Sequence, residues 1–266
     1  MNVVEKLNQR VDKVNSLLSV GLDPDFSRLP EKFKKDKNPQ FEFNKFIMNE
    51  TYEFASTFKM NIAFYEERGA KGYEELKMTM DYIKANFPDI YSICDCKRGD
   101  VTNTNIAYTK EMFDFFDFDA ITVHPYFGRE SLKSFLARKD KGIIILCRSS
   151  NSGAGEFQDL LIDGKKLWEV ITEKVVSDWN YNNNCLLMVG STYPEEMKLA
   201  RKISGDMTIL SPGSGAQGGD LENSVRVGIN SQKKGLVINA SRSIIFSENP
   251  KVAAKKLRDE INKYRS

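Results

Sequence analysis

The stretch IYSICDCKRGD, residues 90–100, joins an apolar run to a dense group of charges. Its first five residues are β-branched, aromatic or small, which is typical of a buried strand. Four charged side chains follow within six positions: Asp95, Lys97, Arg98 and Asp100. Because burying an unpaired charge is costly, this group is either a solvated loop or a set of mutually neutralising charges at a strand end.

The apolar run is one of eight similar runs along the chain. Helix-period stretches at 41–57, 73–87, 166–179 and 195–203 lie between them. Alternating strands and helices indicate βαβ units, and eight of them in about 250 residues predict a (β/α)8 barrel. A doubly wound open sheet is the alternative, but no GxGxxG follows the first strand. The eight predicted strands are Ser19–Leu22, Phe58–Phe64, Ile90–Cys94, Ala120–Val123, Gly142–Cys147, Cys185–Val189, Thr208–Leu210 and Leu236–Ile238.

Composition is that of an ordinary globular chain, with 266 residues, 41% hydrophobic residues and a formal net charge of +2. We expect residues 1–266 to form a single α/β domain, a TIM barrel with an extra N-terminal helix. The mixed charge predicts no nucleic-acid or membrane partner, and no apolar run approaches the roughly 20 residues that span a bilayer. The amphipathic amino terminus does not resemble a signal peptide, which predicts a cytoplasmic location.

The cysteines do not form a metal-binding pattern. Cys94, Cys96, Cys147 and Cys185 lie in or beside apolar runs, and CxC is not a usual zinc spacing. The single histidine, His124, offers little further ligation. We therefore expect buried free thiols in a reducing compartment and a structural histidine.

The loops after the last two strands are suited to an anion. SPGSGAQGGD (211–220) follows the seventh strand, and NASR (239–242) follows the eighth. Glycine lets the backbone approach an anion closely and arginine adds a charged fork, so these loops predict a phosphate ester as ligand. A flexible loop beside a surface arginine is the alternative. The polar segment 149–164 is long enough to be a lid.

The charged group is expected to converge with a lysine from the preceding strand. Alternation along a strand puts Asp95 and Lys97 on one face, and Lys59 and Asn61 on one face of the neighbouring strand. Asp100 lies just beyond on the loop. Such an array can hold an ammonium group that stabilises an anion on carbon and then protonates it. A purely structural network of ion pairs is the alternative.

At these residues the chain resembles the orotidine 5'-phosphate decarboxylase family. DCKRGDVTNT (95–104) fits that family's DxKxxD…T motif, and FKMNIAFYE, GLDPD and PGSGAQGGD fall in the expected order. The resemblance spans essentially the whole chain. FKMNIAFYE, HPYFG and GAQGGD are similar to the branch found in some bacteria and in apicomplexan parasites.

The resemblance implies decarboxylation of orotidine 5'-monophosphate to uridine 5'-monophosphate (UMP), the last step of de novo UMP biosynthesis, without metal or organic cofactor. Lys59, Asp95, Lys97 and Asp100 would form an alternating array in which Lys97 protonates carbon 6 of the pyrimidine. Asp100 and Thr104 would reach the neighbouring subunit's site, which implies a homodimer. An association with orotate phosphoribosyltransferase is left open.

The resemblance also implies a set of substrate contacts. The pyrimidine contact stays open between Ser149 and Ser150, because the lid reads RSSNSG where relatives often have a proline at position 152. The expected contacts are Asp23 and Lys59 on the ribose hydroxyls, Gln217, Gly218, Gly219 and Arg242 on the phosphate, Ser149 or Ser150 on the pyrimidine, and Asn61 and Asn239 at the strand ends.

Three other functions are weighed against this one. Phosphosugar decarboxylases or aldolases of the same suprafamily share DxKxxD, but they use magnesium and carry an acidic residue where Lys59 stands. A Schiff-base aldolase needs a lysine in an apolar pocket, whereas Lys97 has two aspartates nearby. A non-catalytic phosphate-ligand sensor on the same barrel is disfavoured by the intact charged array.

Overall fold

Eight parallel strands close into a barrel, as the alternating pattern predicts. The computed structural model describes residues 3–190, 194–212 and 219–265. Around the barrel the strands follow the order β1-β10-β9-β8-β5-β4-β3-β2, so each neighbours the next along the chain. The barrel strands are β1 Leu18–Gly21, β2 Thr57–Asn61, β3 Tyr91–Arg98, β4 Ala120–Val123, β5 Gly142–Arg148, β8 Cys185–Val189, β9 Ile209–Ser211 and β10 Leu236–Ala240.

The barrel strands are largely apolar because both of their faces are covered. Ile143, Ile144 and Ile145 of β5 are all fully buried, as expected where side chains inside and helices outside exclude water. The second strand ends three residues before the predicted Phe64. The amide oxygen of Asn61 accepts a hydrogen bond from the backbone of Ala63 at 3.1 Å, which turns the chain into a helix.

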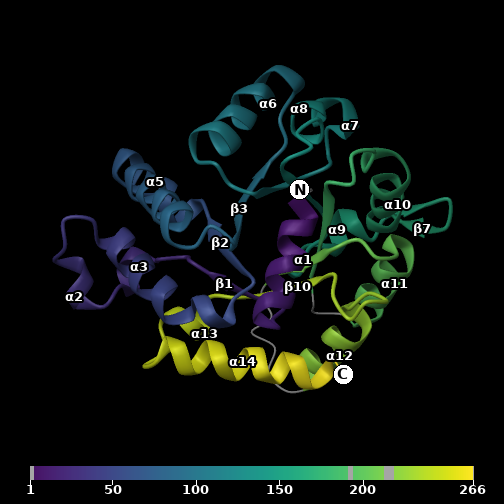
Figure 1. The fold of residues 1–266 in the computed structure, drawn as a ribbon. Helices are drawn as coiled ribbons and strands as arrows, with labels where there is room; N and C mark the ends of the chain where they lie inside the picture. Colours follow the sequence, from purple (N-terminus) through teal and green to yellow (C-terminus); the bar gives the residue numbers. More distant parts are fainter. Residues whose placement is uncertain (1–2, 191–193, 213–218, 266) are drawn as a thin grey trace.

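Helices surround the barrel, and Figure 1 shows them as a ring around the strands. The four predicted helical stretches overlap α3, α5, α10 and α11, and the first of them, 41–57, was predicted too long because it runs to Thr57 at the start of β2. The helices are α1 Val3–Val14, α2 Glu31–Lys34, α3 Pro39–Thr51, α4 Ala63–Glu66, α5 Gly69–Asn86, α6 Thr102–Thr109, α7 Gly128–Ser131, α8 Lys133–Leu136, α9 Gly155–Gln158, α10 Leu167–Lys174, α11 Pro194–Ser204, α12 Gly219–Gly228, α13 Arg242–Ile245 and α14 Pro250–Tyr264.

Short helical turns of other types extend several of these elements. A 3₁₀ turn precedes α2, another continues α3, and π-helical turns continue α6 and α10. The helix α2 lies in the lysine-rich segment 28–38. These turns are η1 Phe26–Arg28, η2 Tyr52–Phe54, η3 Lys110–Phe115 and η4 Val175–Trp179.

The extra N-terminal helix covers the amino-terminal end of the barrel, over the centre of the ring in Figure 1. Val3, Leu7 and Val11 of α1 are buried at helical spacing. Arg10 is buried with them, and its guanidinium donates to Asp89 at 2.8 Å. One apolar stripe and one buried cation thus hold α1 against the strands.

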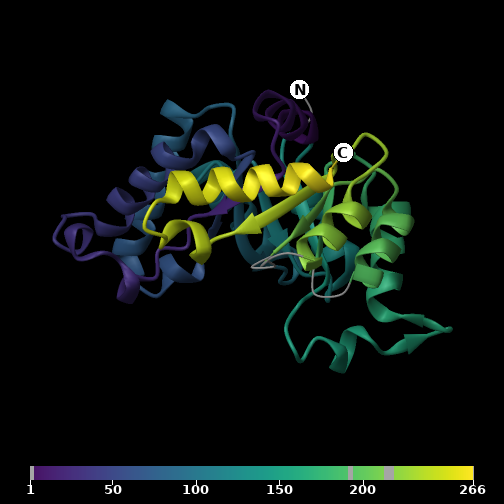
Figure 2. The same cartoon turned by 90° about the horizontal axis from the view of Figure 1, so that it is seen from below.

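The lid segment lies at the opposite end of the barrel. It is not a simple loop, because it contains α9 and a two-stranded hairpin of β6 Leu161–Ile162 and β7 Lys165–Lys166. Figure 2 shows this hairpin projecting from the side of the molecule that faces away from α1. Phe157 and Leu161 are exposed there.

The expectation of buried free thiols agrees with the structure. All four cysteines are buried and free of disulfides. None of the helices in the described ranges combines the length and apolar character that crossing a membrane requires.

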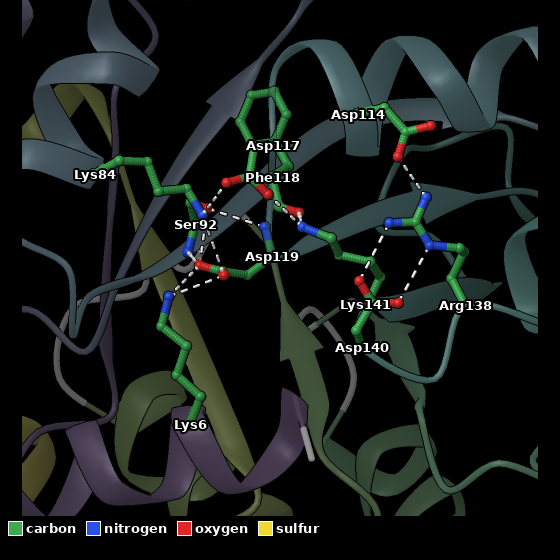
Figure 3. A network of polar contacts seen from close by, with 10 residues as sticks. All are labelled: Lys6, Lys84, Ser92, Asp114, Asp117, Phe118, Asp119, Arg138, Asp140 and Lys141. Atoms are coloured by element: carbon green, nitrogen blue, oxygen red, sulfur yellow. Dashed lines mark hydrogen bonds and ion pairs between the residues drawn. The ribbon is translucent and has the colours of Figure 1, made fainter. Parts of the chain in front are cut away.

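A polar network joins α1, α5, β3 and the start of β4 at the amino-terminal end (Figure 3). The carboxylate of Asp119 accepts hydrogen bonds from the backbone and hydroxyl of Ser92 at 2.8 and 2.9 Å. Lys6 of α1 donates to both oxygens at 2.8 Å. Lys84 of α5 lies 3.5 Å from Asp119 and 3.2 Å from Asp117. The network therefore fastens the closing helix to the barrel wall.

Replacing Asp119 by alanine is expected to lower the free energy of unfolding by about 3 kcal/mol, because a buried ion pair and the partner of Ser92 are lost together. Denaturant titration measures the change. Asp178→Ala is the matched control, since Asp178 pairs with Arg129 on the surface with more than half of its side chain exposed, and its loss is expected to stay below about 1 kcal/mol. Equal effects of the two substitutions would contradict this role of Asp119.

Candidate active site

The site begins with a buried lysine between two carboxylates. Lys59 of β2 is 3% exposed, and its Nζ lies 3.5 Å from Oδ2 of Asp95 and 3.9 Å from Oδ1 of Asp23. The parallel register pairs Asn61, the last residue of β2, with Asp95, so the end of β2 lies level with Asp95. The backbone of Asn61 also donates to Asp23 at 2.9 Å. Three strand ends therefore meet at one cation.

A second lysine approaches Asp95 from the other side. Nζ of Lys97 donates to Oδ1 of Asp95 at 2.6 Å, while Oδ2 faces Lys59. The side chain of Lys97 is 45% exposed, in contrast to the buried Lys59. The site thus holds one enclosed ammonium and one that solvent or a ligand can reach.

The pKa shifts follow from these contacts. Burial alone raises the pKa of Asp95, but Lys59, Lys97 and a hydrogen bond from Thr122 outweigh it and hold this pKa below its usual range. Burial alone lowers the pKa of Lys59, but Asp23 and Asp95 outweigh it and raise this pKa above its usual value. Both groups are therefore charged at neutral pH.

Asp100 and Thr104 lie beyond this cluster. The carboxylate of Asp100 accepts a hydrogen bond from the backbone N–H of Val101 at 2.6 Å. The side-chain amide of Asn105 accepts from the backbone N–H of Asp100 and donates to its carbonyl oxygen. Within the described part of its own chain, Asp100 forms no ion pair. Thr104 lies half-buried in the first turn of α6. The structure therefore does not pair Asp100 with Lys97 of the same chain.

The two lid serines have different surroundings. The hydroxyl of Ser149 donates to Asn151 at 2.7 Å and accepts from Gln158 at 2.9 Å, and Gln158 also accepts from the backbone of Ser149. Ser150 is exposed. A Cβ at Gly190 would lie 2.8 Å from that of Ser150, so the lid packs against the end of β8 only because residue 190 is glycine.

The residues expected at the phosphate end lie on β10 and α13. Asn239 is buried, and its amide oxygen accepts a hydrogen bond from Ser19 at 3.1 Å across β1 and β10. Arg242 is exposed at the first residue of α13, and its guanidinium forms no ion pair with any described residue. An exposed guanidinium at this end of the barrel is suited to contact an anion.

The glycine-rich loop is described only at its ends. Gln217 and Gly218 lie outside the described residues, and Gly219 is the first residue of α12. The loop leaves β9 at Ser211, at the carboxyl-terminal end of the barrel. The predicted phosphate loop thus begins at the same end of the barrel as Lys59 and Asp95.

A family model matches most of the chain. Residues 16–257 match the model described as "Orotidine 5'-phosphate decarboxylase / HUMPS family". The chain belongs to this family. The resemblance inferred from the DxKxxD motif is therefore confirmed.

Curated relatives in the orotidine 5'-phosphate decarboxylase family match along the full chain. The protein named orotidine 5'-phosphate decarboxylase from Cellvibrio japonicus is 40% identical over 271 residues, covering 98% of both chains. The protein of the same name from Azoarcus sp. is 41% identical over 272 residues, covering 100% of both. The matches therefore span nearly the whole of this chain and of each relative.

Solved structures of the family share the fold. The OMP decarboxylase of Leishmania donovani superimposes with a TM-score of 0.88 at 33% identity, covering 100% of this chain and 99% of that one. A structure titled UMP synthase from the same organism gives a TM-score of 0.90 at 35% identity, and this chain covers 57% of it. The second protein is therefore longer and contains the same barrel.

Sequence reasoning missed Thr122 of β4 and Gln158 of α9. The hydroxyl of Thr122 donates to Asp95 at 2.9 Å and accepts from the backbone of Lys97 at 3.0 Å. A polar residue inside the apolar run AITV was the only signal for it. Gln158 lies in a polar segment and gave no signal. Among the described residues, no group of three or more His, Cys, Asp or Glu side chains is arranged to hold a metal ion.

Replacing Asp95 by asparagine is expected to lower the free energy of unfolding by about 3 kcal/mol at pH 7, because Lys59 then stays buried with only Asp23 nearby. The lowered pKa of Asp95 means that its contribution is present above about pH 4 and is lost as the pH falls through the folded value. The difference from wild type should therefore shrink below about pH 4. Denaturant titrations at several pH values measure it.

Asp36→Asn is the control, because Asp36 is exposed. Its difference from wild type should stay small at every pH. A difference for Asp95→Asn that grows as the pH falls would contradict the assignment.

Proposed function

We propose that the chain decarboxylates orotidine 5'-monophosphate to UMP and CO2 in pyrimidine biosynthesis. The supporting observation is the buried carboxylate of Asp95 with Lys59 on one oxygen and Lys97 on the other, at the carboxyl ends of barrel strands in a chain of this family. The family description also includes HUMPS. Lys59 favours the decarboxylase, because the phosphosugar relatives are expected to carry an acidic residue there.

The chemistry follows from the charge that develops on carbon. The bond between carbon 6 and the carboxylate breaks, CO2 leaves, and the electron pair stays on carbon 6. The ammonium of Lys97 stabilises this pair and donates a proton to it, forming the new C–H bond. Lys97 suits this role because it is half exposed, and solvent can restore its proton after product leaves.

Asp95 and Asp100 have complementary roles in this proposal. Asp95 fixes the ammonium of Lys97 through the 2.6 Å contact and lies beside the departing carboxylate. The negative charges of Asp95 and the substrate repel each other, and this repulsion is relieved as CO2 leaves. Asp100 completes the alternating array with Lys59, Asp95 and Lys97.

Contacts remote from the reacting bond bind and align the nucleotide. Asp23 and Lys59 contact the ribose, and Asn61 and Asn239 lie at neighbouring strand ends. The phosphate binds Gln217, Gly218, Gly219 and Arg242. The binding energy of these ribose and phosphate contacts is gained away from carbon 6. It can therefore support closure of the lid and alignment of the base.

Ser150 is the better candidate of the two lid serines for the pyrimidine edge. The hydroxyl of Ser149 already bonds to Asn151 and Gln158. The hydroxyl of Ser150 is exposed beside the end of β8. A bound base can therefore contact Ser150 without breaking the hydrogen bonds that shape the lid.

We further propose a cytoplasmic homodimer with shared sites, in which residues 1–266 form one decarboxylase domain. Asp100 and Thr104 then contribute to the partner's site. Val101, Ile106, Tyr126 and Phe127 support this arrangement, because these apolar side chains are exposed around α6 and the loop after β4. Association with orotate phosphoribosyltransferase is part of the same proposal, since the longer Leishmania donovani protein titled UMP synthase contains this barrel.

Incubation with orotidine 5'-monophosphate, with a chelator present, tests reaction and metal independence together. The wild-type protein is expected to remove the ultraviolet absorbance of the orotate ring, and Lys97→Ala to abolish this turnover because the proton donor is gone. Calorimetric titration should show that Lys97→Ala still binds UMP.

Lys133→Ala is the control, since Lys133 lies two-thirds exposed on α8, and it should leave turnover unchanged. Near-normal turnover by Lys97→Ala would refute its role as proton donor. A wild-type protein that binds UMP without turnover would favour the sensor function.

Subunit mixing tests the shared site. Asp100→Ala and Lys97→Ala are each expected to be inactive alone, but a hybrid dimer contains one site with both native residues. An equal mixture should therefore recover about a quarter of the wild-type activity after subunit exchange. Mixing two preparations of Lys97→Ala is the control and should recover none. No recovery despite demonstrated exchange would exclude sharing of Asp100.

A further inference from the structure

The strand that carries Asp95 and Lys97 is distorted between them. From Cys94 to Arg98, β3 advances four residues, while the paired positions on β4, Ile121 and Val123, advance only two. Two extra residues are thus accommodated in β3, as in a bulge. Lys97 adopts a left-handed backbone with φ of 44°, which is unfavourable for a residue with a side chain.

One hydroxyl group replaces a backbone hydrogen bond that the bulge removes between β3 and β4. The backbone N–H of Lys97 donates to Oγ1 of Thr122 at 3.0 Å, so a side chain on β4 takes the place of a strand carbonyl. Thr122 is fully buried, where a backbone donor without a partner would be costly. The bulge is therefore stabilised at its strained residue.

The same hydroxyl orients the carboxylate of Asp95. Thr122 donates its proton to Oδ1 of Asp95 at 2.9 Å, the oxygen that also accepts from Nζ of Lys97. A hydroxyl has one proton to donate and lone pairs to accept, and both are used here. Lys59 faces the other oxygen of Asp95. Three groups from three strands thus fix the rotation of one carboxylate.

We propose that Thr122 is a positioning residue, whose hydroxyl holds the bulge in β3 and thereby aligns the ammonium of Lys97 with Asp95 and with the reacting carbon. The inference rests on the proposed function. A regular strand would carry Lys97 past Asp95 with a different backbone direction, and small errors in the placement of a proton donor reduce turnover strongly. Thr122 touches neither substrate nor the reacting atoms in this scheme.

Paired substitutions separate the hydroxyl from the rest of the side chain. Thr122→Val keeps the shape and removes the hydroxyl, whereas Thr122→Ser keeps the hydroxyl. We expect Thr122→Val to lower kcat about 10- to 100-fold, with KM and the Kd for UMP within about threefold of wild type. Thr122→Ser should retain kcat within about threefold.

If Thr122→Val does not fold, Thr122→Ala can be compared with Thr122→Ser instead. These two variants also differ by the hydroxyl oxygen. Thr122→Ala should then show the loss of kcat that Thr122→Ser does not. A purely structural hydroxyl predicts a lower melting temperature with unchanged kcat per folded enzyme, and that result would overturn the proposal. Equal losses of kcat in Thr122→Ser and Thr122→Val would also overturn the proposal. A loss of kcat accompanied by an equally large weakening of UMP binding would do the same.

The wild-type assay keeps the two proposals distinguishable. Absence of orotidine 5'-monophosphate turnover in the wild-type protein would refute the proposed function and with it the role of Thr122. Normal wild-type turnover together with an unimpaired Thr122→Val would refute only the positioning role.

Discussion

The buried carboxylate of Asp95 between two ammonium groups is the interaction on which the site depends. A single buried charge would be strongly unfavourable, but Lys59 and Lys97 each face one of its oxygens. The arrangement requires the end of β2 to lie level with Asp95 in β3, and the parallel register provides this. It also requires a second carboxylate, Asp23, because two cations around one anion leave a net positive charge.

The two ends of the barrel have different roles: the amino-terminal end contributes to stability, and the carboxyl-terminal end carries the proposed chemistry. At the amino-terminal end, α1 and the network around Asp119 close the barrel with ion pairs that are satisfied within the chain. At the carboxyl-terminal end, Arg242 has no ion-pair partner in the described part of the chain, and Lys97 is half exposed. Exposed charges of this kind are suited to contact a ligand. This division is general in barrels of this type.

Much of the fold was predictable because strand and helix periods are local properties of the chain. All eight strands were located, since each is a short apolar run that is buried on both faces. The second strand was predicted three residues too long, because the Asn61 side chain that starts α4 is a specific contact and not a pattern. The lid was predicted as a loop, and its hairpin of only two residues per strand is too short to give a period.

The sequence by itself determined the order of the charges in the proposed site, because Lys59, Asp95, Lys97 and Asp100 lie in or just after β2 and β3, which are neighbours in the closed barrel. Tertiary structure alone decided how Lys97 reaches Asp95. Simple alternation predicts a regular strand there, whereas the bulge depends on the hydroxyl of Thr122 from another strand, 25 residues away from Lys97. Such a contact has no local signature, because its two partners become neighbours only when the barrel closes.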